Sequence, residues 1–209
     1  MEIGDKKMQI VAAAEALFAE KGFKGTSVRD IAERAGVNLA MISYYFGSKD
    51  QLLEALFELR GEETKKHLQE IVDKPKLSAL ARINLLIDNT ADKFVHQTSF
   101  NKIMVREQVI PSNAAISKLI LNLKIQNYKV AMQLLKEGQK SGEIQKNIDP
   151  ELLMSTIIGI LNHFYTSQQY YRVIRNMEDL PDAEFQNRMK KRITHYLKFL
   201  IKKILTNEE

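Results

Sequence analysis

The sequence predicts an all-α protein, and three observations support this prediction. Apolar residues recur three and four positions apart through most of the 209 residues, which is the spacing of one helix face. Ser, Asn and Asp residues stand just before several of these runs and Gly residues follow them, as helix caps do. The composition, with 44% hydrophobic and 27% charged residues, is that of a globular chain able to bury a core.

The N-terminal part predicts three helices. The first covers residues 6–21 and ends at a glycine; its buried stripe contains Ile10, Ala13, Ala14, Leu17 and Phe18. Ser27 and Asp30 have the spacing of a capping box that opens a second helix. Gly36 can take the left-handed conformation that ends it, and Asn38 is a suitable N-cap for a third helix over residues 39–45.

Two short helices around a glycine-containing turn make a helix-turn-helix, whose second helix can enter the DNA major groove. Ile42 and Phe46 lie four positions apart and are predicted to face the core. The outward positions are then Leu39, Ala40, Met41, Ser43, Tyr44 and Tyr45. An ordinary corner between two helices has the same spacing, so the spacing alone leaves both interpretations open.

Three motifs in residues 10–56 decide between them. Leu17, Phe18, Gly22 and Phe23 form an LF-x-x-x-G-F pattern, TSVRDIAERAGV follows, and YYFGSK closes the third helix. Together they resemble the N-terminal domain of TetR-family transcriptional regulators. One position departs from the family pattern: Ser43 stands where an aromatic residue is common, so the operator sequence cannot be carried over.

The resemblance implies a three-helix DNA-binding domain over residues 4–64, with the helix-turn-helix at 27–46. A helical domain for effector binding and dimerisation would follow over residues 65–209. The implied function is a DNA-binding regulator, usually a repressor, that binds a pseudo-palindromic operator as a dimer and is released by a small molecule. The alternative is a non-switching DNA-binding dimer whose C-terminal domain serves only dimerisation.

The charge distribution limits how this chain would bind DNA. The net charge is +5, yet residues 1–64 hold 8 basic and 11 acidic residues, against 23 and 15 in residues 65–209. DNA affinity must therefore come from a few placed groups, with Lys24 among the candidates. Lys49 opens a helix predicted over 48–71, where it would face a phosphate or solvent. The predicted DNA-contacting residues are Thr26, Ser27, Arg29, Asn38, Leu39, Ala40, Met41, Ser43, Tyr44, Tyr45 and Lys49.

Further helices are predicted over residues 77–95, 100–109, 113–140, 150–177 and 182–206. Asp149 is the expected N-cap of the helix at 150–177, with Pro150 in its first turn. That helix is apolar on almost every side, so one face needs a partner. The last helix carries a coiled-coil-like seam. A four-helix dimer interface is predicted, with an intrachain bundle as the alternative; its residues are Ser155, Gly159, Ile193, Leu197, Leu200 and Ile204.

A ligand pocket is expected among aromatic, thioether and polar side chains of the C-terminal domain. The candidates are Phe94, His96, Phe100, Met104, Asn122, Tyr128, Met132, His163 and Tyr165. The same residue types also form ordinary cores. The four histidines have no metal-binding spacing and there are no cysteines, so no metal and no cofactor is expected.

No motif of an enzyme is present: the sequence lacks a nucleophile elbow, a glycine-rich dinucleotide loop and a His-Glu metal motif. No signal peptide and no run of about 18 apolar residues is found, which favours a cytoplasmic protein without a membrane partner. The expected partners are double-stranded operator DNA, a second copy of the chain and a small hydrophobic or amphipathic effector.

Overall fold

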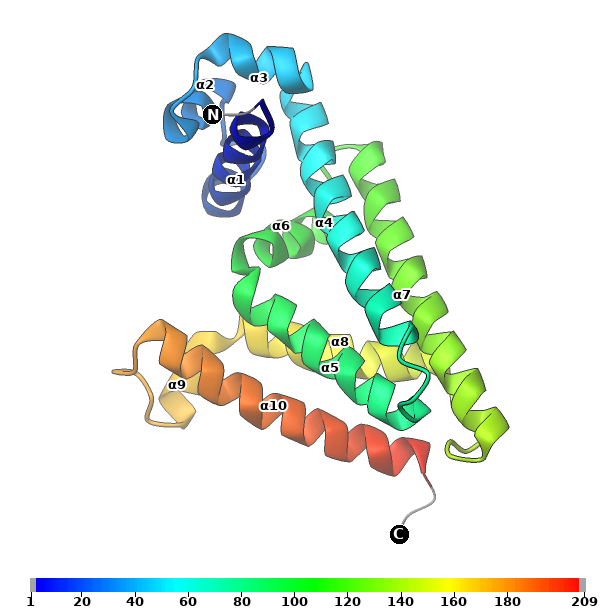
Figure 1. Ribbon diagram of the computed structural model, residues 1–209. Coiled ribbons are helices and arrows are strands. Elements are labelled where there is room, and N and C mark those ends of the chain that lie inside the picture. Colours follow the sequence, from blue (N-terminus) through cyan, green and yellow to red (C-terminus); the bar gives the residue numbers. More distant parts are fainter. Residues whose placement is uncertain (1–2, 207–209) are drawn as a thin grey trace. The chain divides into compact units, whose positions relative to one another are not determined.

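A computed structural model describes residues 3–206, and these residues form ten α-helices and no strand (Figure 1). The all-α prediction is therefore confirmed. The helices are α1 Ile3–Lys21, α2 Val28–Ala35, α3 Leu39–Phe46, α4 Lys49–Val72, α5 Ala79–His96, α6 Thr98–Val109, α7 Ala114–Ser141, α8 Pro150–Thr166, α9 Gln168–Ile174 and α10 Asp182–Leu205.

The chain divides into two compact units. The head unit contains the described residues up to Lys65 together with Thr98–Ile125, and the body unit contains Lys66–Gln97 and the residues from Gln126 onward. The first of these breaks lies one residue after the predicted boundary at residue 64. Residues 98–125 were predicted in the C-terminal domain, but they pack with the N-terminal residues.

The core of the head unit explains this difference. Phe100 of α6 is buried, and its ring lies 5.1 Å from the ring of Phe57 on α4. The start of α7 adds further buried residues to the same core, namely Ile116, Ile120 and Leu123. These contacts join segments far apart in the sequence, which helical spacing within each segment cannot reveal.

Side-chain hydrogen bonds also link α6 and α7 to the N-terminal helices. Arg106 Nη1 donates to the carbonyl oxygen of Phe18 at 3.0 Å, at the C-terminal end of α1. Asn113 Nδ2 donates to Asp50 Oδ1 at 2.9 Å, in the first turn of α4. Basic groups suit the exposed carbonyls at a helix C-terminus, so the first of these contacts is electrostatically favourable.

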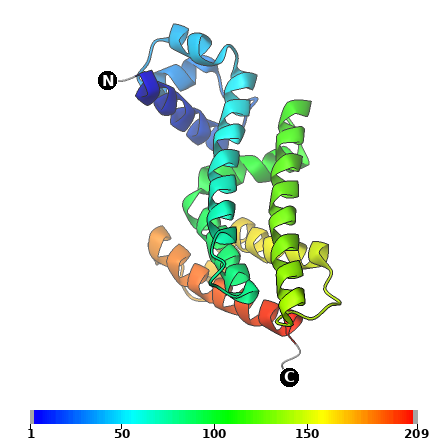
Figure 2. The same cartoon turned by 45° about the vertical axis from the view of Figure 1, so that its right-hand side comes forward.

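In the body unit, α10 packs along α5, and α8 contacts both helices (Figure 2). Fully buried side chains from α7 and α10 meet in this core, among them Leu134, Phe185, Leu197 and Ile201. Arg172 of α9 is also buried; it donates to the carbonyls of Met177 and Leu180 and lies 4.2 Å from the ring centre of Phe185.

The single helix predicted for residues 150–177 is wrong, because the chain breaks at Ser167 between α8 and α9. The Ser167 N–H bonds to the carbonyls of His163 and Phe164, as at a helix C-terminus. The Thr166 hydroxyl donates to the Asn162 carbonyl at 2.9 Å. Short polar side chains of this kind compete with the helical pattern, and two in succession favour its end.

None of the helices within residues 3–206 is both long and apolar enough to cross a membrane.

Candidate nucleic-acid interface

Local hydrogen bonds fix the turn between α2 and α3. The Ser27 hydroxyl accepts from the Asp30 N–H at 3.1 Å, and the Asp30 carboxylate accepts from the Ser27 N–H at 2.9 Å. Gly36 has φ 62°, the left-handed conformation, and Asn38 Oδ1 accepts from the Ala40 N–H at 2.9 Å. The predicted capping box, glycine stop and N-cap are all confirmed.

The exposed face of α3 is the central feature of the site. Ile42 and Phe46 are buried in the core of the head unit, as predicted. On the opposite side, Leu39, Ala40, Ser43 and Tyr44 are exposed, and 81% of the Tyr44 surface is accessible. A hydroxyl can bond to a base edge or a phosphate, and methyl groups can contact thymine. This face therefore has the chemistry needed to read duplex DNA.

Met41 and Tyr45, two other residues of α3 that were predicted to contact DNA, support the exposed face from the side of the core. Met41 and Tyr45 are half-buried and pack against the core of the head unit. The Tyr45 ring meets the Tyr44 ring edge-on, with centroids 5.1 Å apart. Tyr45 thus helps to orient Tyr44, whose ring is the more accessible one.

The prediction that Thr26 contacts DNA through its side chain is wrong. Thr26 is only 1% exposed, and its hydroxyl is directed at the carbonyls of Gly22 and Leu17, at 2.8 and 3.2 Å. A buried hydroxyl is satisfied inside the protein and has no surface for a phosphate. Thr26 instead closes the junction between α1 and α2.

Lys49 also differs from its predicted environment. Its ammonium donates to the carbonyls of Phe23 and Thr26, at 2.9 and 2.8 Å, and lies 4.3 Å from the ring centre of Phe23. It is half-buried. Two of its three N–H groups are therefore used within the protein, and sequence spacing gave no signal for this long-range contact.

The exposed cations around α2 and α3 are few. Lys24 and Arg29 are exposed, whereas Arg34 forms an ion pair with Glu20 at 2.8 Å.

The hydrogen bond from the Ser27 backbone, joined by that from its hydroxyl, lowers the pKa of Asp30 below its usual value. Asp30 therefore stays ionised at neutral pH and completes the cap of α2.

Sequence reasoning missed one cation. Lys7 of α1 has its ammonium 5.6 Å from the ring centre of Phe46, at the C-terminal end of α3. Only the packing of α1 against the following helices brings these two residues together. The contact places a positive charge beside the last turn of α3.

The predicted dimer interface is partly wrong. Leu197 is fully buried and Ile193 is 8% exposed, both within the core of their own body unit. Ile204 also packs against this core and Leu200 is half-buried, while Ser155 and Gly159 are exposed. The seam on α10 is real, but α5 of the same chain covers it.

A different face of the same two helices is exposed. Leu152 on α8 is 66% exposed, and Tyr196 and Phe199 on α10 are 54% and 58% exposed. A groove of about 1010 Å³ runs between the helices, lined by Gly159, Ile160, His163, Tyr171, Met189, Lys191, Arg192, Ile193, His195, Tyr196 and Phe199. Large exposed apolar residues beside a groove are typical of an interaction surface.

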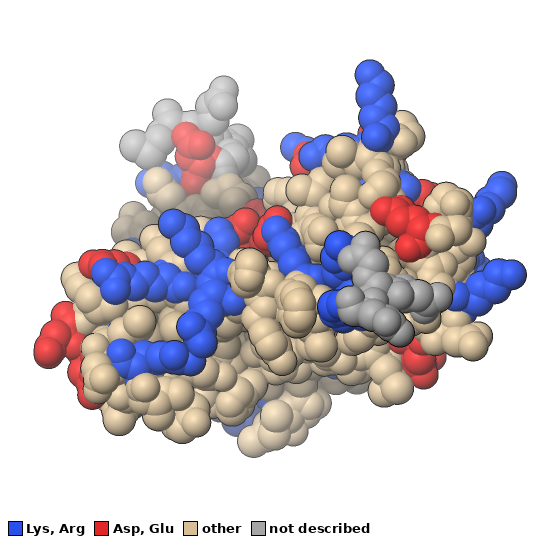
Figure 3. Space-filling view, turned by 90° about the horizontal axis from the view of Figure 1, so that it is seen from below, with Lys and Arg blue, Asp and Glu red and all other residues tan. Residues whose placement is uncertain are grey.

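Figure 3 looks at the body unit from the side that carries α10, and Lys and Arg side chains gather there. On this helix, Lys191 and Arg192 are exposed, while Arg188 pairs with Glu184 at 2.5 Å. Lys190 and Lys198 form ion pairs with Asp92 and Asp88 of α5. The exposed face of α8 and α10 is therefore aromatic and basic.

The nine predicted pocket residues do not form one site. Phe100 and Met104 pack in the head unit, whereas Phe94 and Tyr165 of the body unit face each other with ring centroids 6.2 Å apart. Burial raises the pKa of Tyr165 to about 12. The remaining residues are spread over α5, α7 and α8: Asn122 is exposed, Tyr128 and Met132 are half-buried, and His96 and His163 line separate pockets.

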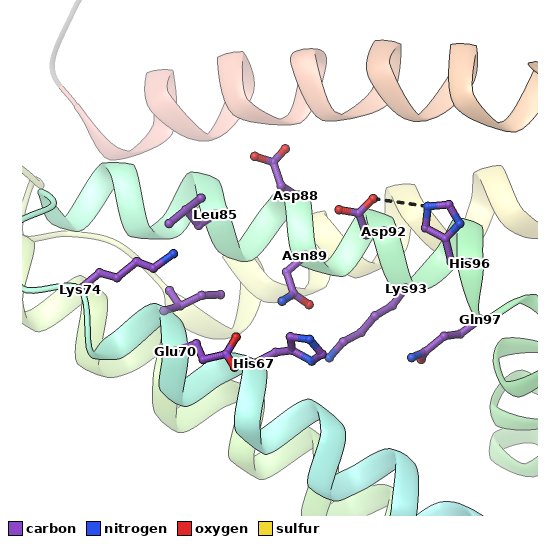
Figure 4. A pocket seen from close by; sticks show the side chains of 11 residues that line it. His67, Glu70, Lys74, Leu85, Asp88, Asn89, Asp92, Lys93, His96 and Gln97 are labelled. Carbon is purple, nitrogen blue, oxygen red and sulfur yellow. Dashed lines mark ion pairs between the residues drawn. The ribbon is translucent and has the colours of Figure 1, made fainter.

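One of these pockets lies between the last turns of α4 and α5 (Figure 4). Its volume is about 430 Å³, and its lining contains His67, Glu70, Ile71, Lys74, Leu85, Asp88, Asn89, Asp92, Lys93, His96 and Gln97. Asp88 and Asp92 are already paired with lysines of α10, and Asp92 also lies 3.9 Å from His96. Within the described residues no group of three His, Asp or Glu side chains is placed to hold a metal.

The sequence is similar to those of known transcriptional regulators. Residues 10–56 match the sequence profile of the bacterial regulatory proteins of the tetR family. The chain is 30% identical over 175 residues to the probable HTH-type transcriptional regulator YttP of Bacillus subtilis, and the alignment covers 82% of this chain and 83% of that protein.

Two solved structures have a similar fold. The ketosteroid transcriptional regulator KstR2 of Mycobacterium tuberculosis aligns with a TM-score of 0.73 at 22% identity, over 98% of this chain and 97% of that one. The transcriptional regulator FadR from Bacillus subtilis, in complex with stearoyl-CoA, aligns with a TM-score of 0.68 at 23% identity, over 91% and 96% of the two chains. At these identities the likeness is one of fold.

Proposed function

Because the chain belongs to the TetR family of transcriptional regulators, we propose that it is a repressor that binds a pseudo-palindromic operator as a homodimer. The observation that carries this proposal is the exposed face of α3. Leu39, Ser43 and Tyr44 project from a helix whose N-terminus is capped and whose other side is buried. A helix held in this way can present the same side chains to the major groove each time it binds.

The body unit supplies the dimer in this proposal. A second copy of the chain covers the exposed face of α8 and α10, which includes Leu152, Tyr196 and Phe199. Two-fold symmetry then places two α3 helices on half-sites separated by about 34 Å, or a multiple of it, which is one turn of DNA. The aromatic side chains favour this role, since aromatic residues are enriched at interfaces.

Selection of bound sequences from random duplex DNA tests the proposal. We expect enrichment of a motif with two inverted half-sites whose centres are about 10 base pairs, or a multiple, apart. The Tyr44→Ala variant, run in parallel, should enrich that motif less strongly. No enrichment by the unmodified protein at moderate salt would contradict DNA reading, and enrichment of one asymmetric site would contradict the symmetric dimer.

We further propose that a small amphipathic effector binds the body unit and lowers operator affinity. The pocket between α4 and α5 supports this, since about 430 Å³ lies within the usual range for small-molecule sites. The FadR structure, which contains stearoyl-CoA, makes a fatty acyl thioester the first compound to test. By linkage, an effector that releases DNA must bind more weakly to the DNA complex.

A non-switching dimer is the second candidate. It is favoured by the separation of the predicted pocket residues, two of which belong to the head core while His96 and His163 line different pockets. Thermal unfolding with stearoyl-CoA, shorter acyl-CoAs and free fatty acids separates the two candidates. A compound that stabilises the protein and weakens operator binding supports the switch. Absence of both effects across the series supports the non-switching dimer.

A further inference from the structure

We infer that Lys49 is a positioning residue of the head unit. It holds the loop between α1 and α2, residues 22–27, in the conformation that α2 and α3 need. It acts on DNA affinity through this loop and not by contact with a phosphate. The consequence for DNA rests on the proposed function, whereas the effect on the loop does not.

The contacts of Lys49 carry the inference. As the first residue of α4, it reaches back 26 and 23 positions to donate to the carbonyls of Phe23 and Thr26, at 2.9 and 2.8 Å. Its ammonium also lies 4.3 Å from the centre of the Phe23 ring. A cation over an aromatic face with two carbonyl acceptors is well satisfied without solvent. Such a group loses these partners if it turns away to a phosphate.

Other contacts hold the same loop: the Gly22 N–H donates to the Phe18 carbonyl at 3.0 Å, and the Thr26 N–H donates to the Phe23 carbonyl at 3.3 Å. The Phe23 ring packs on Phe18 with centroids 5.5 Å apart, and the Thr26 hydroxyl is directed back at the carbonyls of Gly22 and Leu17. Ser27, the next residue, is the N-cap of α2. Any shift at Thr26 therefore moves the start of α2, and α3 follows α2 through the fixed turn at Gly36.

The two roles of a lysine near DNA have different signatures. A phosphate contact gives an affinity loss that shrinks as salt rises, because the slope of log K against log salt changes by about 0.9 for each contact. A positioning role lowers affinity at every salt concentration and leaves that slope unchanged. It also disturbs the loop in the absence of DNA.

The test compares three variants of the full chain. Lys49→Met keeps the length of the side chain but removes the charge and all three donors. Lys49→Arg keeps a cation that can stack on Phe23 and donate to both carbonyls. Lys24→Met is the matched control, since it removes an exposed lysine from the same loop and leaves the contacts of Lys49 in place. Amide hydrogen exchange of residues 22–31 is measured without DNA, and operator binding is measured over a salt series on a duplex obtained by selection.

We expect Lys49→Met to speed exchange at residues 22–31 by about tenfold or more, because two charge-assisted hydrogen bonds are lost. Exchange of the buried α4 residues Leu52 and Leu53 should stay slow, which shows that the variant is folded. Lys49→Arg should restore most of the protection, and Lys24→Met should leave it unchanged. Operator affinity of Lys49→Met should fall by a constant factor across the salt series.

Unchanged exchange in Lys49→Met would overturn the inference. A salt slope flatter by about one in this variant would also overturn it, in favour of a direct phosphate contact. If Lys49→Met unfolds globally, Lys49→Arg becomes the deciding variant. Fast amide exchange of residues 22–31 in a folded Lys49→Arg protein would then contradict the positioning role. If the unmodified protein binds no duplex at all, the proposed function fails, and the exchange data still decide the role of Lys49 in the loop.

Discussion

The helices α3 and α10 were both predicted to present residues to a partner. Most of the predicted residues are exposed on α3, but the main one on α10 is buried. On α3 the predicted inward residues, Ile42 and Phe46, are buried, and Leu39, Ser43 and Tyr44 face outward. On α10 the predicted outward seam contains Leu197, which is fully buried against the same chain. Tyr196 and Phe199, on another side of α10, are the exposed ones.

The difference teaches what helical spacing can establish. Spacing identifies an apolar stripe but does not say which element covers it. For α3, the capping box at Ser27, the stop at Gly36 and the cap at Asn38 predicted where α2 and α3 begin and where α2 ends. The position of α2 next to α3 then indicated which side of α3 is buried. For α10 the covering helix, α5, lies about 100 residues earlier in the chain, and no local signal identifies it.

The largest expected effect is on the buried seam. Leu197→Asp places a carboxylate at a fully buried position of the body core, which should cost more than about 4 kcal/mol of stability. We expect loss of the cooperative unfolding transition of the body unit, measured by calorimetry and circular dichroism. A stable, folded monomer would restore the original assignment of Leu197 to the dimer interface.

The exposed side of α10 should respond in the opposite way. Phe199→Asp removes an exposed ring and adds a charge, so helix content should stay the same while the dimer weakens by about 100-fold or more, roughly 2.7 kcal/mol. Sedimentation velocity over a concentration series measures this change. Val173→Asp on α9, 51% exposed in the unmodified chain, is the control and should leave the dimer intact. Equal behaviour of the two variants would argue against this surface as the interface.

On α3, Tyr44→Ala should lower operator affinity by about 10- to 100-fold and affect non-specific DNA much less. Its thermal stability should be unchanged, because the ring is 81% exposed. Tyr170→Ala, at an exposed tyrosine of the body unit, is the matched control for fluorescence anisotropy with specific and random duplexes. An unaltered operator affinity in Tyr44→Ala would remove this residue from the reading face.

The local caps can be tested on their own. Ser27→Ala leaves the Asp30 N–H without its side-chain acceptor and should destabilise the head unit by about 1 kcal/mol. Urea unfolding measures the change, and Ser141→Ala at the end of α7 is the comparison for a serine outside this unit. If Ser141→Ala lowers the free energy of unfolding as much as Ser27→Ala does, the hydrogen bond of the cap does not account for the loss.

The smallest effect concerns pH. The pKa of Asp30 is lowered mainly by the hydrogen bond from the Ser27 backbone, so its stabilising contribution is present above the unfolded pKa of about 4. It is lost as the pH falls through the lower pKa of the folded state. In the unmodified protein the melting temperature should therefore fall more steeply below about pH 4 than in Asp30→Asn. Parallel curves for the two proteins would contradict this contribution.

The sequence allowed much of the head to be predicted and less of the body. The starts of α2, α3 and α8 follow from residues within a few positions, namely the N-caps Ser27, Asn38 and Asp149, and these predictions agree with the structure. The roles of Thr26 and Lys49 could not be predicted in the same way, because their partners lie up to 26 positions away.

The expected pocket failed for a related reason. Aromatic and thioether residues at helical spacing form ordinary cores more often than ligand sites, and only the fold separates Phe100 in the head unit from Phe94 and Tyr165 in the body unit. The segment 98–125 illustrates the same limit, since its apolar residues fit either unit until the partners are known.

The central claim is that the exposed face of α3 is offered twice to the major groove, and the absence of cysteine allows a direct measurement. Ser43→Cys introduces a single thiol on that face, to which a DNA-cleaving iron chelate can be attached; Ser141→Cys, in the body unit, is the control. On the selected duplex we expect two cleavage centres related by the operator dyad and about 10 base pairs, or a multiple, apart. Cleavage no stronger than that of the Ser141→Cys conjugate, or a single cleavage centre, would contradict the claim.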